Sequence, residues 1–270
     1  MKNNKRSALI TGAAGLLGPQ HAAALIEKGF QVVLIDLDLK GLKKTRKNLI
    51  IKYPNAKIVI HSIDITKEKK IKKLNKSLKK RGIVIDTLIN NAALNPKMSE
   101  YNKSTSGMVE NYSANFLIKE INVGILGAFF CCKIFGSDMA KNNFGVIVNI
   151  GSDLAINAPD HSVYHKSDNF DKVKNFKPIG YSITKFSLLG LTKYLGTYWA
   201  RKNVRCNMLI PGAVENKQPK FLIKNVKKRI PMNRWAKPNE YKKAIQFLCS
   251  DSNSYMTGQT LIIDGGRTAW

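Results

Sequence analysis

The chain has 270 residues, of which 44% are hydrophobic, and this length and composition suit one large α/β domain with a buried core. Its four cysteines have neither metal-site spacing nor the density of a secreted disulfide framework, so we expect reduced thiols in a cytoplasmic protein. The formal net charge of +27 comes mainly from lysines spread along the chain; without a recognition-helix, zinc-finger or aromatic-platform signature, it favours solvated surfaces over a nucleic-acid partner.

Short apolar segments alternate with lysine-rich segments of helical pattern along the whole chain. The predicted strands are 7–11, 31–35, 56–62, 87–90, 145–150, 205–210 and 260–263. The predicted helices are 17–28, 42–52, 67–81, 116–142, 181–202 and 239–250. This alternation predicts a mostly parallel sheet with helices on both faces. We find no linker or repeat, so we expect residues 1–270 to form a single domain.

No segment predicts a membrane span. The longest apolar run, 123–132, is about ten residues and is too short to cross a bilayer. The first 18 residues imitate a signal peptide, but glycines interrupt the apolar part and have another explanation.

A glycine-rich turn joins the first strand to the first helix. Gly12, Gly15 and Gly18 stand where backbone amides can approach a pyrophosphate at a helix N-terminus. Asp36 ends the second strand, where a carboxylate accepts the ribose hydroxyls of NAD and repels the 2′-phosphate of NADP. The alternatives are a plain glycine-rich turn, and Asp36 and Asp38 merely ending a strand in solvent. We favour a dinucleotide, and NAD over NADP.

Asp64 and Ile65 follow the third predicted strand. Asp64 is placed to meet the adenine edge of a bound dinucleotide, and its alternative role is a helix N-cap.

Tyr181 and Lys185 lie four residues apart, which places them on one face of a predicted helix. An ammonium beside a phenol favours the phenolate, so we expect the pKa of Tyr181 to fall toward neutral. A phenol tuned in this way exchanges a proton with a carbonyl or alcohol oxygen. The alternative is a solvated helix face that carries both residues by chance.

The order of these motifs along the chain resembles the short-chain dehydrogenase/reductase family over almost its whole length. The further matching motifs are Asn90-Asn91-Ala92-Ala93, Asn122, Ser152, Pro211-Gly212, Gly258 and Asp264-Gly265-Gly266. The resemblance implies a single Rossmann-type domain, a doubly wound parallel sheet of about seven strands, and hydride transfer between a nicotinamide cofactor and a small-molecule substrate.

The resemblance also implies residue roles. Tyr181 is the general acid/base, Lys185 lowers its pKa and binds the nicotinamide ribose, Ser152 holds the substrate oxygen, and Asn122 holds a water of a proton relay. Taken alone, Ser152 suits a strand-end turn and Asn122 a buried helix position with a local partner. The implied cofactor-binding residues are Gly12, Gly15, Leu16, Leu17, Gly18, Asp36, Asp64, Ile65, Asn91, Ala92, Tyr181, Lys185, Pro211, Gly212 and Val214.

The sequence departs from the family pattern at Leu16 and Ala93, where glycine is usual, at Asn216, where threonine is common, and in a long insertion at about 157–180. The insertion joins the fifth strand to the helix of Tyr181, so it lies beside the substrate pocket.

The expected substrate residues are Lys97, Ser152, His161 and Tyr164, and this polar lining suits a polar or anionic substrate. Tyr164 is a poor base, because Asp168 raises the pKa of its phenol. His161 and His165 lack further ligands, so we expect no metal.

The insertion, the turn 95–97 and the C-terminal residues 267–270 resemble dehydrogenases of bacterial surface-sugar pathways, such as flagellin modification. We therefore expect an NAD-dependent oxidoreductase acting on a sugar or sugar derivative, with segment 215–235 closing over the substrate.

The apolar face of helix 181–200 suggests a homodimer or homotetramer, or packing within the monomer. The alternative functions are a reductase of another carbonyl substrate, such as a 3-oxoacyl thioester, a non-catalytic NAD-binding protein, and a nucleic-acid-binding protein.

Overall fold

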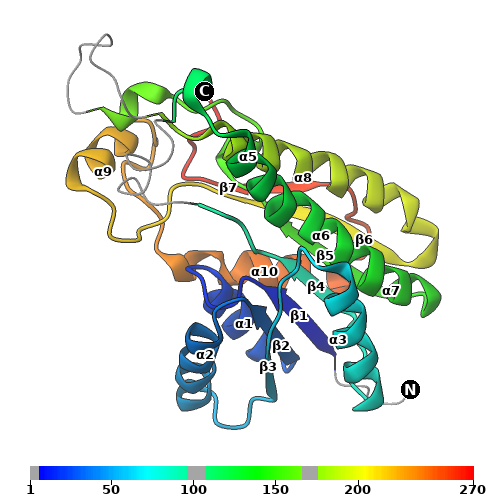
Figure 1. Ribbon diagram of the computed structural model, residues 1–270. Coiled ribbons are helices and arrows are strands. Elements are labelled where there is room, and N and C mark those ends of the chain that lie inside the picture. The colour runs from blue at the N-terminus through cyan, green and yellow to red at the C-terminus, as the bar shows by residue number, and fades with distance from the viewer. Residues whose placement is uncertain (1–5, 96–106, 166–175) are drawn as a thin grey trace.

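The structure, a computed structural model, describes residues 6–95, 107–165 and 176–270. Seven strands form one parallel sheet in the order β3-β2-β1-β4-β5-β6-β7 (Figure 1). The strands are β1 Ser7–Thr11, β2 Gln31–Asp36, β3 Ile58–Ser62, β4 Thr87–Asn90, β5 Gly145–Ile150, β6 Val204–Pro211 and β7 Thr260–Ile263. The predicted fold class is confirmed, since helices cover both faces of this sheet.

The helices follow the predicted order, with one addition and one subdivision. They are α1 Gly18–Ile26, α2 Leu39–Lys52, α3 Glu68–Lys80, α5 Ala114–Ile121, α6 Gly127–Cys131, α7 Ser137–Lys141, α8 Ile179–Tyr198, α9 Lys220–Lys227 and α10 Lys242–Leu248. The single helix predicted over 116–142 is α5, α6 and α7 in series, joined by π-helical turns at Asn122–Leu126 and Cys132–Gly136. Helix α9 lies inside segment 215–235, which we expect to close over the substrate and for which the sequence pattern predicts no helix.

Side chains of the central strands alternate between two apolar layers. On β1, Ala8 and Ile10 join the layer formed with α1, α2 and α10, whereas Leu9 joins the layer formed with α3, α6 and α8. All five residues of β1 are buried. A parallel strand buried on both faces favours apolar residues at successive positions, as in Ala8, Leu9 and Ile10, while the polar Ser7 and Thr11 stand at the two ends of β1.

The strand order reverses between β1 and β4. Strand β1 pairs with β2 on one side and with β4 on the other, so the connections that leave β1 and β4 diverge to opposite faces of the sheet. A crevice opens outside the carboxyl ends of the strands at such a reversal. Because the strands are parallel, the loops that follow them lie together at the carboxyl-terminal end of the sheet. These are the loops after β1, β2, β4, β5 and β6.

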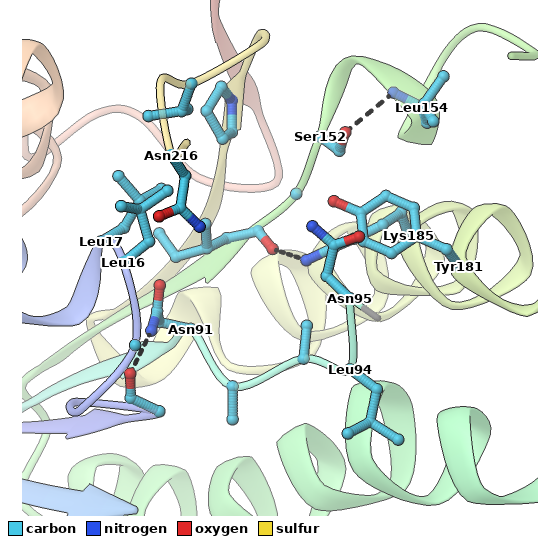
Figure 2. A pocket seen from close by; sticks show the side chains of 18 of the residues that line it. Leu16, Leu17, Asn91, Leu94, Asn95, Ser152, Leu154, Tyr181, Lys185 and Asn216 are labelled. Atoms are coloured by element: carbon cyan, nitrogen blue, oxygen red, sulfur yellow. Dashed lines mark hydrogen bonds between the residues drawn. The ribbon is translucent and has the colours of Figure 1, made fainter. Parts of the chain in front are cut away.

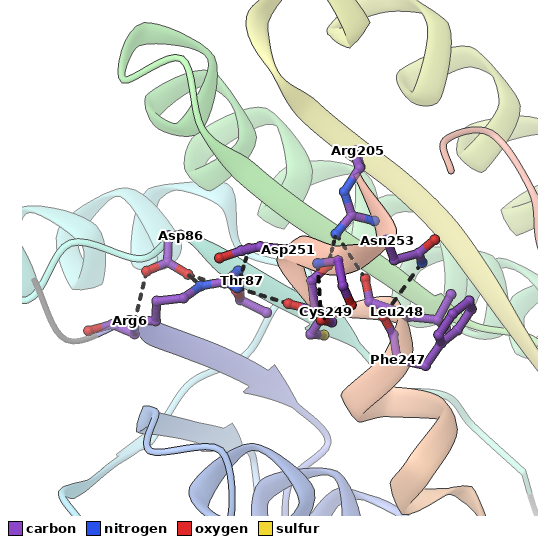
Figure 3. Close-up of polar contacts among 12 residues, drawn as sticks. Arg6, Asp86, Thr87, Arg205, Phe247, Leu248, Cys249, Asp251 and Asn253 are labelled. Atoms are coloured by element: carbon purple, nitrogen blue, oxygen red, sulfur yellow. Dashed lines mark hydrogen bonds and ion pairs between the residues drawn. The ribbon is translucent and has the colours of Figure 1, made fainter. Parts of the chain in front are cut away.

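At the opposite end of the sheet, where the strands begin, Arg6 connects the start of β1 to two other segments of the chain (Figure 3). Its guanidinium pairs with Asp86 at 3.2 Å and donates to the Thr87 hydroxyl at 2.9 Å. It also donates to the Cys249 carbonyl at 2.8 Å and pairs with the exposed Asp251 at 2.9 Å. Because Cys249 is the C-cap residue of α10, Arg6 holds the end of this helix against the sheet.

A second arginine satisfies the neighbouring carbonyls after α10. Arg205 on β6 donates to the carbonyls of Leu248 at 3.2 Å and Ser250 at 3.0 Å (Figure 3). A helix leaves its last carbonyls without intrahelical partners, and basic side chains near the C-terminus are one way of meeting them.

Within the described residues, no helix combines the length and the apolar character that a bilayer crossing needs. All four cysteines are buried and free, and burial raises the pKa of the Cys132 thiol to about 12. These thiols are therefore neutral packing groups.

Replacing Arg6 by Met removes the cation beside Asp86 and the donor to the Cys249 carbonyl. We expect the free energy of unfolding to fall by about 2–3 kcal/mol, because hydrogen bonds to charged groups contribute about 1.5–3 kcal/mol and do not add fully. Urea denaturation followed by circular dichroism measures the change. Lys47→Met, on an exposed position of α2, is the matched control and should change stability by less than about 0.5 kcal/mol. An Arg6→Met variant as stable as this control would contradict the role given to Arg6.

Candidate active site

A cleft of about 910 Å³ lies at the carboxyl ends of the strands. All the residues predicted to bind the cofactor line it, with the exception of Gly18. A Cβ at Gly18 would lie 2.6 Å from the Cα of Ala13 and 2.6 Å from the carbonyl oxygen of Gly12. Gly18 therefore permits close packing of α1 beneath the turn rather than contact with a ligand.

The glycine turn after β1 is fastened to the end of β4. Gly12 has a φ of +62°, and a Cβ there would lie 2.7 Å from the Cα of Ala92. The Asn91 side-chain amide donates to the carbonyls of Thr11 at 3.0 Å and Gly12 at 2.9 Å, and Figure 2 shows one of these two bonds. The Thr11 hydroxyl accepts from the backbone N–H of both Asn91 and Ala92 at 3.0 Å. These contacts hold the turn against the end of β4, with a positive φ and a close approach that both require glycine at position 12.

Asp36 is fixed at the end of β2 beside this turn. One carboxylate oxygen accepts from the backbone N–H of Ala14 at 3.0 Å, and the other from Asp38 at 3.1 Å. The half-buried carboxylate still lines the cleft and keeps lone pairs for a ligand's hydroxyl groups. Asp38 takes a different part, because its side chain caps α2 by accepting from Gly41 at 2.9 Å.

Asp64 also lines the cleft, and it is not the N-cap of α3. It accepts from the backbone N–H of Thr66 at 2.9 Å and from the Thr66 hydroxyl at 2.7 Å, which organises the turn before the helix. The N-cap position of α3 is Lys67, so the alternative role that the sequence allowed for Asp64 is not the one observed.

Ser152, Tyr181 and Lys185 line the same part of the cleft (Figure 2). Ser152 follows β5, donates to Asp153 at 2.8 Å and accepts from the backbone N–H of Leu154 at 3.3 Å. Tyr181 and Lys185 lie one turn apart near the start of α8, with the Lys185 Nζ 5.6 Å from the centre of the Tyr181 ring. The local turn considered for Ser152 is thus present, and its hydroxyl nonetheless faces the cleft.

Burial is the largest cause of the shifted pKa values of Tyr181 and Lys185. Desolvation raises the pKa of Tyr181 to about 12, against a lowering by the Ser152 hydrogen bond. Desolvation, and secondarily the charge of Lys177, lowers the pKa of Lys185 to about 8. The expected fall of the Tyr181 pKa toward neutral is wrong in this structure, because Lys185 donates to the Ile150 carbonyl at 2.7 Å rather than to the phenol oxygen.

Asn122 lies in the π-helical turn between α5 and α6. It does not line the cleft, although its neighbour Val123 does. In the same turn, a Cβ at Gly124 would lie 2.9 Å from the Cβ of Thr184, so this turn packs closely on α8 beside Tyr181. The relay role of Asn122 stays a prediction.

Of the predicted substrate residues other than Ser152, one lines the cleft, one does not, and one lies outside the described residues. Tyr164 lines the cleft, and burial raises the pKa of its phenol, which agrees with its dismissal as a base. His161 does not line the cleft, and its ring packs edge-on against Phe176 with centroids 5.3 Å apart. Lys97 and Asp168 lie outside the described residues.

Segment 215–235 packs against the N-terminal part of the insertion, around Val163. Leu222 and Val226 of α9 pack with Val163 and Trp235 in a small apolar cluster beside the cleft. The Asn225 amide donates to the carbonyl of Val163 at 3.2 Å. Asn216 also lines the cleft (Figure 2). The segment is therefore docked on the insertion in this structure.

Four charged residues of the cleft were missed by sequence reasoning: Asp153, Lys177, Lys217 and Arg267. Arg267 and Asp153 form an ion pair at 2.8 Å with side chains 14% and 9% exposed. Lys177 carried one signal, because it stands four residues before Tyr181. Arg267 carried none, because only the fold brings the C-terminal residues to the loop after β5.

Residues 6–225 match the family described as short chain dehydrogenase. Among curated proteins, the chain is 30% identical to a 3-oxoacyl-[acyl-carrier-protein] reductase of Buchnera aphidicola, covering 98% of each chain. It is 28% identical to an NAD-dependent glycerol dehydrogenase of Listeria innocua, over 97% of this chain and 93% of that one. Among solved structures, a short chain dehydrogenase of Leptospira borgpetersenii with bound NAD+ superposes with a TM-score of 0.80, at 25% identity, over 98% of this chain and 93% of that one.

The raised pKa of Tyr181 is directly measurable. Burial disfavours the charged phenolate, so in the protein without added nucleotide the phenol should stay protonated below about pH 10. The difference between wild-type protein and Tyr181→Phe in near-ultraviolet tyrosinate absorbance reports this one group during a pH titration. An ionisation step in that difference between about pH 6 and pH 8 would show that the lysines, not burial, set the pKa.

Proposed function

The chain belongs to the short-chain dehydrogenase family and is an oxidoreductase, and we propose that it transfers a hydride between NAD and an alcohol or ketone carbon of a polar, sugar-like substrate. One observation carries this proposal: Ser152, Tyr181 and Lys185 line the cleft that also contains the glycine turn and Asp36. A dinucleotide along this cleft joins the phosphate-binding turn to the proton-transferring group.

The residues divide the chemistry as follows. The nicotinamide cofactor supplies and accepts the hydride when it is bound. The Ser152 hydroxyl, already held by Asp153 and Leu154, orients the substrate oxygen. The Tyr181 hydroxyl exchanges a proton with that oxygen, and Lys185, buried one turn away, stabilises the phenolate that this leaves. Asn122, at the π-helical turn, is proposed to hold a water that passes the proton on.

The glycine turn and Asp36 fit a dinucleotide. A Cβ at Gly12 would collide with Ala92, so glycine is needed for the turn to pack against the end of β4, and Gly12 also lines the cleft. Asp36 is anchored by two backbone N–H groups, which fixes its lone pairs toward ribose hydroxyls and its charge against a 2′-phosphate. We therefore propose NAD as the preferred cofactor.

Two observations support a polar substrate. The cleft wall near Tyr181 carries Lys177, Arg267 and Asp153, which suit hydroxyl-rich or anionic groups better than an acyl chain. A relative is named as a glycerol dehydrogenase. We place the chain with the surface-sugar branch on the sequence motifs given above, and in the cytoplasm on its four unpaired thiols.

A second candidate is the reduction of a 3-oxoacyl thioester. It is favoured by the 30% identity to the Buchnera aphidicola reductase and needs the same three catalytic residues. Assays of polyol oxidation and of acetoacetyl thioester reduction, run side by side at equal enzyme concentration, distinguish the two.

Helices α6 and α8 present apolar side chains to solvent, and we propose that they form the contact of a homodimer or homotetramer. Phe129, Phe186, Tyr194 and Tyr198 are 41%, 45%, 64% and 64% exposed, and the two tyrosine rings stack with centroids 5.6 Å apart. Exposed aromatic clusters of this kind mark interaction surfaces. Sedimentation velocity of the purified chain measures its mass.

Tyr181→Phe tests the catalytic proposal against a non-catalytic NAD-binding protein. It removes the proton-transferring hydroxyl and keeps the ring, so we expect turnover to fall by about 10²- to 10⁴-fold. NADH affinity, measured by fluorescence titration, should change by less than about threefold. Tyr255→Phe is the control, because Tyr255 is fully exposed. Undiminished turnover in Tyr181→Phe would refute the assignment.

Asp36→Asn tests the cofactor preference. The amide oxygen accepts from only one of the two backbone N–H groups and the negative charge is lost, so binding of NADH weakens and repulsion of NADPH is relieved. We expect the NADH-to-NADPH affinity ratio to fall by about tenfold or more, since hydrogen bonds to charged groups contribute about 1.5–3 kcal/mol. Fluorescence titration with each nucleotide measures the ratio. An unchanged ratio would remove Asp36 from cofactor selection.

A further inference from the structure

Lys177 lies on the substrate side of the cleft, just before α8. It is half-buried, and its ammonium nitrogen lies 3.9 Å from the centre of the Tyr181 ring. It donates to the side-chain oxygen of Asn95 at 2.9 Å. Asn95 lies beside Tyr181 at the cleft (Figure 2). A substrate whose reacting oxygen sits between the Ser152 and Tyr181 hydroxyls therefore brings its neighbouring carbon atoms toward Lys177.

The other cations that line the cleft are engaged differently. Arg267 is paired with Asp153, and Lys185 donates to a backbone carbonyl beneath the cleft. Lys217 is exposed at the rim. Lys177 makes no ion pair within 4 Å among the described residues, and the partner it does have, Asn95, is a neutral amide.

The carboxylates that act on Lys177 do so from a distance. Burial lowers the pKa of Lys177 to about 8, while Asp153 and Glu120 raise it. Asp153 is already neutralised by Arg267, and Glu120 accepts from the Tyr112 hydroxyl at 2.5 Å. Near neutral pH, Lys177 is mostly charged. A half-buried charge with only a neutral partner is costly, and an anion brought by a ligand relieves that cost.

We propose that Lys177 selects an anionic substrate, forming an ion pair with a carboxylate or phosphate group close to the carbon that is oxidised or reduced. This rests on the proposed function and names its substrate class. A competing role is purely structural: an ammonium over the Tyr181 ring holds the phenol in place by a cation–π contact. The two roles predict different effects of a substitution. Loss of a structural role alters turnover of every substrate, whereas loss of an anion-selecting role alters that of anionic substrates alone.

Lys177→Met and Lys177→Arg separate these roles with matched substrates. Gluconate and glucitol differ only in a terminal carboxylate against a hydroxymethyl group, and glycerol 3-phosphate and glycerol differ only in the phosphate. Wild-type kcat/KM should be about tenfold or more higher for an anionic member than for its neutral partner. Lys177→Met should raise KM for that anion by about 10- to 100-fold, and Lys177→Arg should restore most of the loss.

The neutral substrates and a control complete the experiment. Turnover of glucitol and glycerol by Lys177→Met should stay within about threefold of wild type, as should all activities of Lys47→Met on α2. An equal loss of kcat for charged and neutral substrates would assign Lys177 to positioning Tyr181. The absence of any preference for anions in the wild type would overturn the inference.

A binding measurement keeps the inference separate from the proposed reaction. Malonate and inorganic phosphate are titrated calorimetrically into wild type and Lys177→Met in the presence of NADH. We expect affinity of the wild type for at least one anion to exceed that of Lys177→Met by about tenfold or more. If no substrate is turned over but this difference is present, the proposed reaction fails and the inference stands. If wild type binds neither anion, the inference fails whatever the activity.

Discussion

The contact between the end of β1 and the end of β4 determines the position of everything else in the cleft. Asn91 donates to two carbonyls of the turn, and Thr11 accepts from two backbone groups beyond β4. These bonds cross the point where the strand order reverses, which is where a crevice opens in such a sheet. With the turn held there, α1 packs beneath it at Gly18, and Asp36 on the adjacent strand accepts a hydrogen bond from the backbone N–H of Ala14 in the turn.

Desolvation, more than charge pairing, shifts the pKa values of three groups around the Tyr181 ring. Tyr181, Lys177 and Lys185 all have burial as the largest cause of their shifted pKa values, and for each it favours the neutral form. Placing two lysines within 6 Å of one tyrosine ring is therefore costly in the protein alone. Groups of this kind are retained at functional sites, where a bound ligand changes their environment.

Most strands and the residues of the glycine turn are predictable from local pattern, because each depends on near neighbours. The middle of a strand buried on both faces is apolar, and the turn residue packed against Ala92 must be glycine. The π-helical turns and α9 were not predicted. A π-turn adds one residue within an otherwise helical pattern, and α9 gains its burial from Val163 of the distant insertion.

The sequence by itself determined the parallel α/β sheet, the family, and the residues that face the cleft from the ends of the strands, because these depend on periodicity and on motifs of fixed spacing. Only the tertiary structure decided the charge around Tyr181. Lys185 is directed at the Ile150 carbonyl, Arg267 reaches Asp153 from the C-terminal end of the chain, and Lys177 is left with Asn95. Electrostatic energies depend on burial and on distances between segments remote in sequence, and no local pattern encodes either of them.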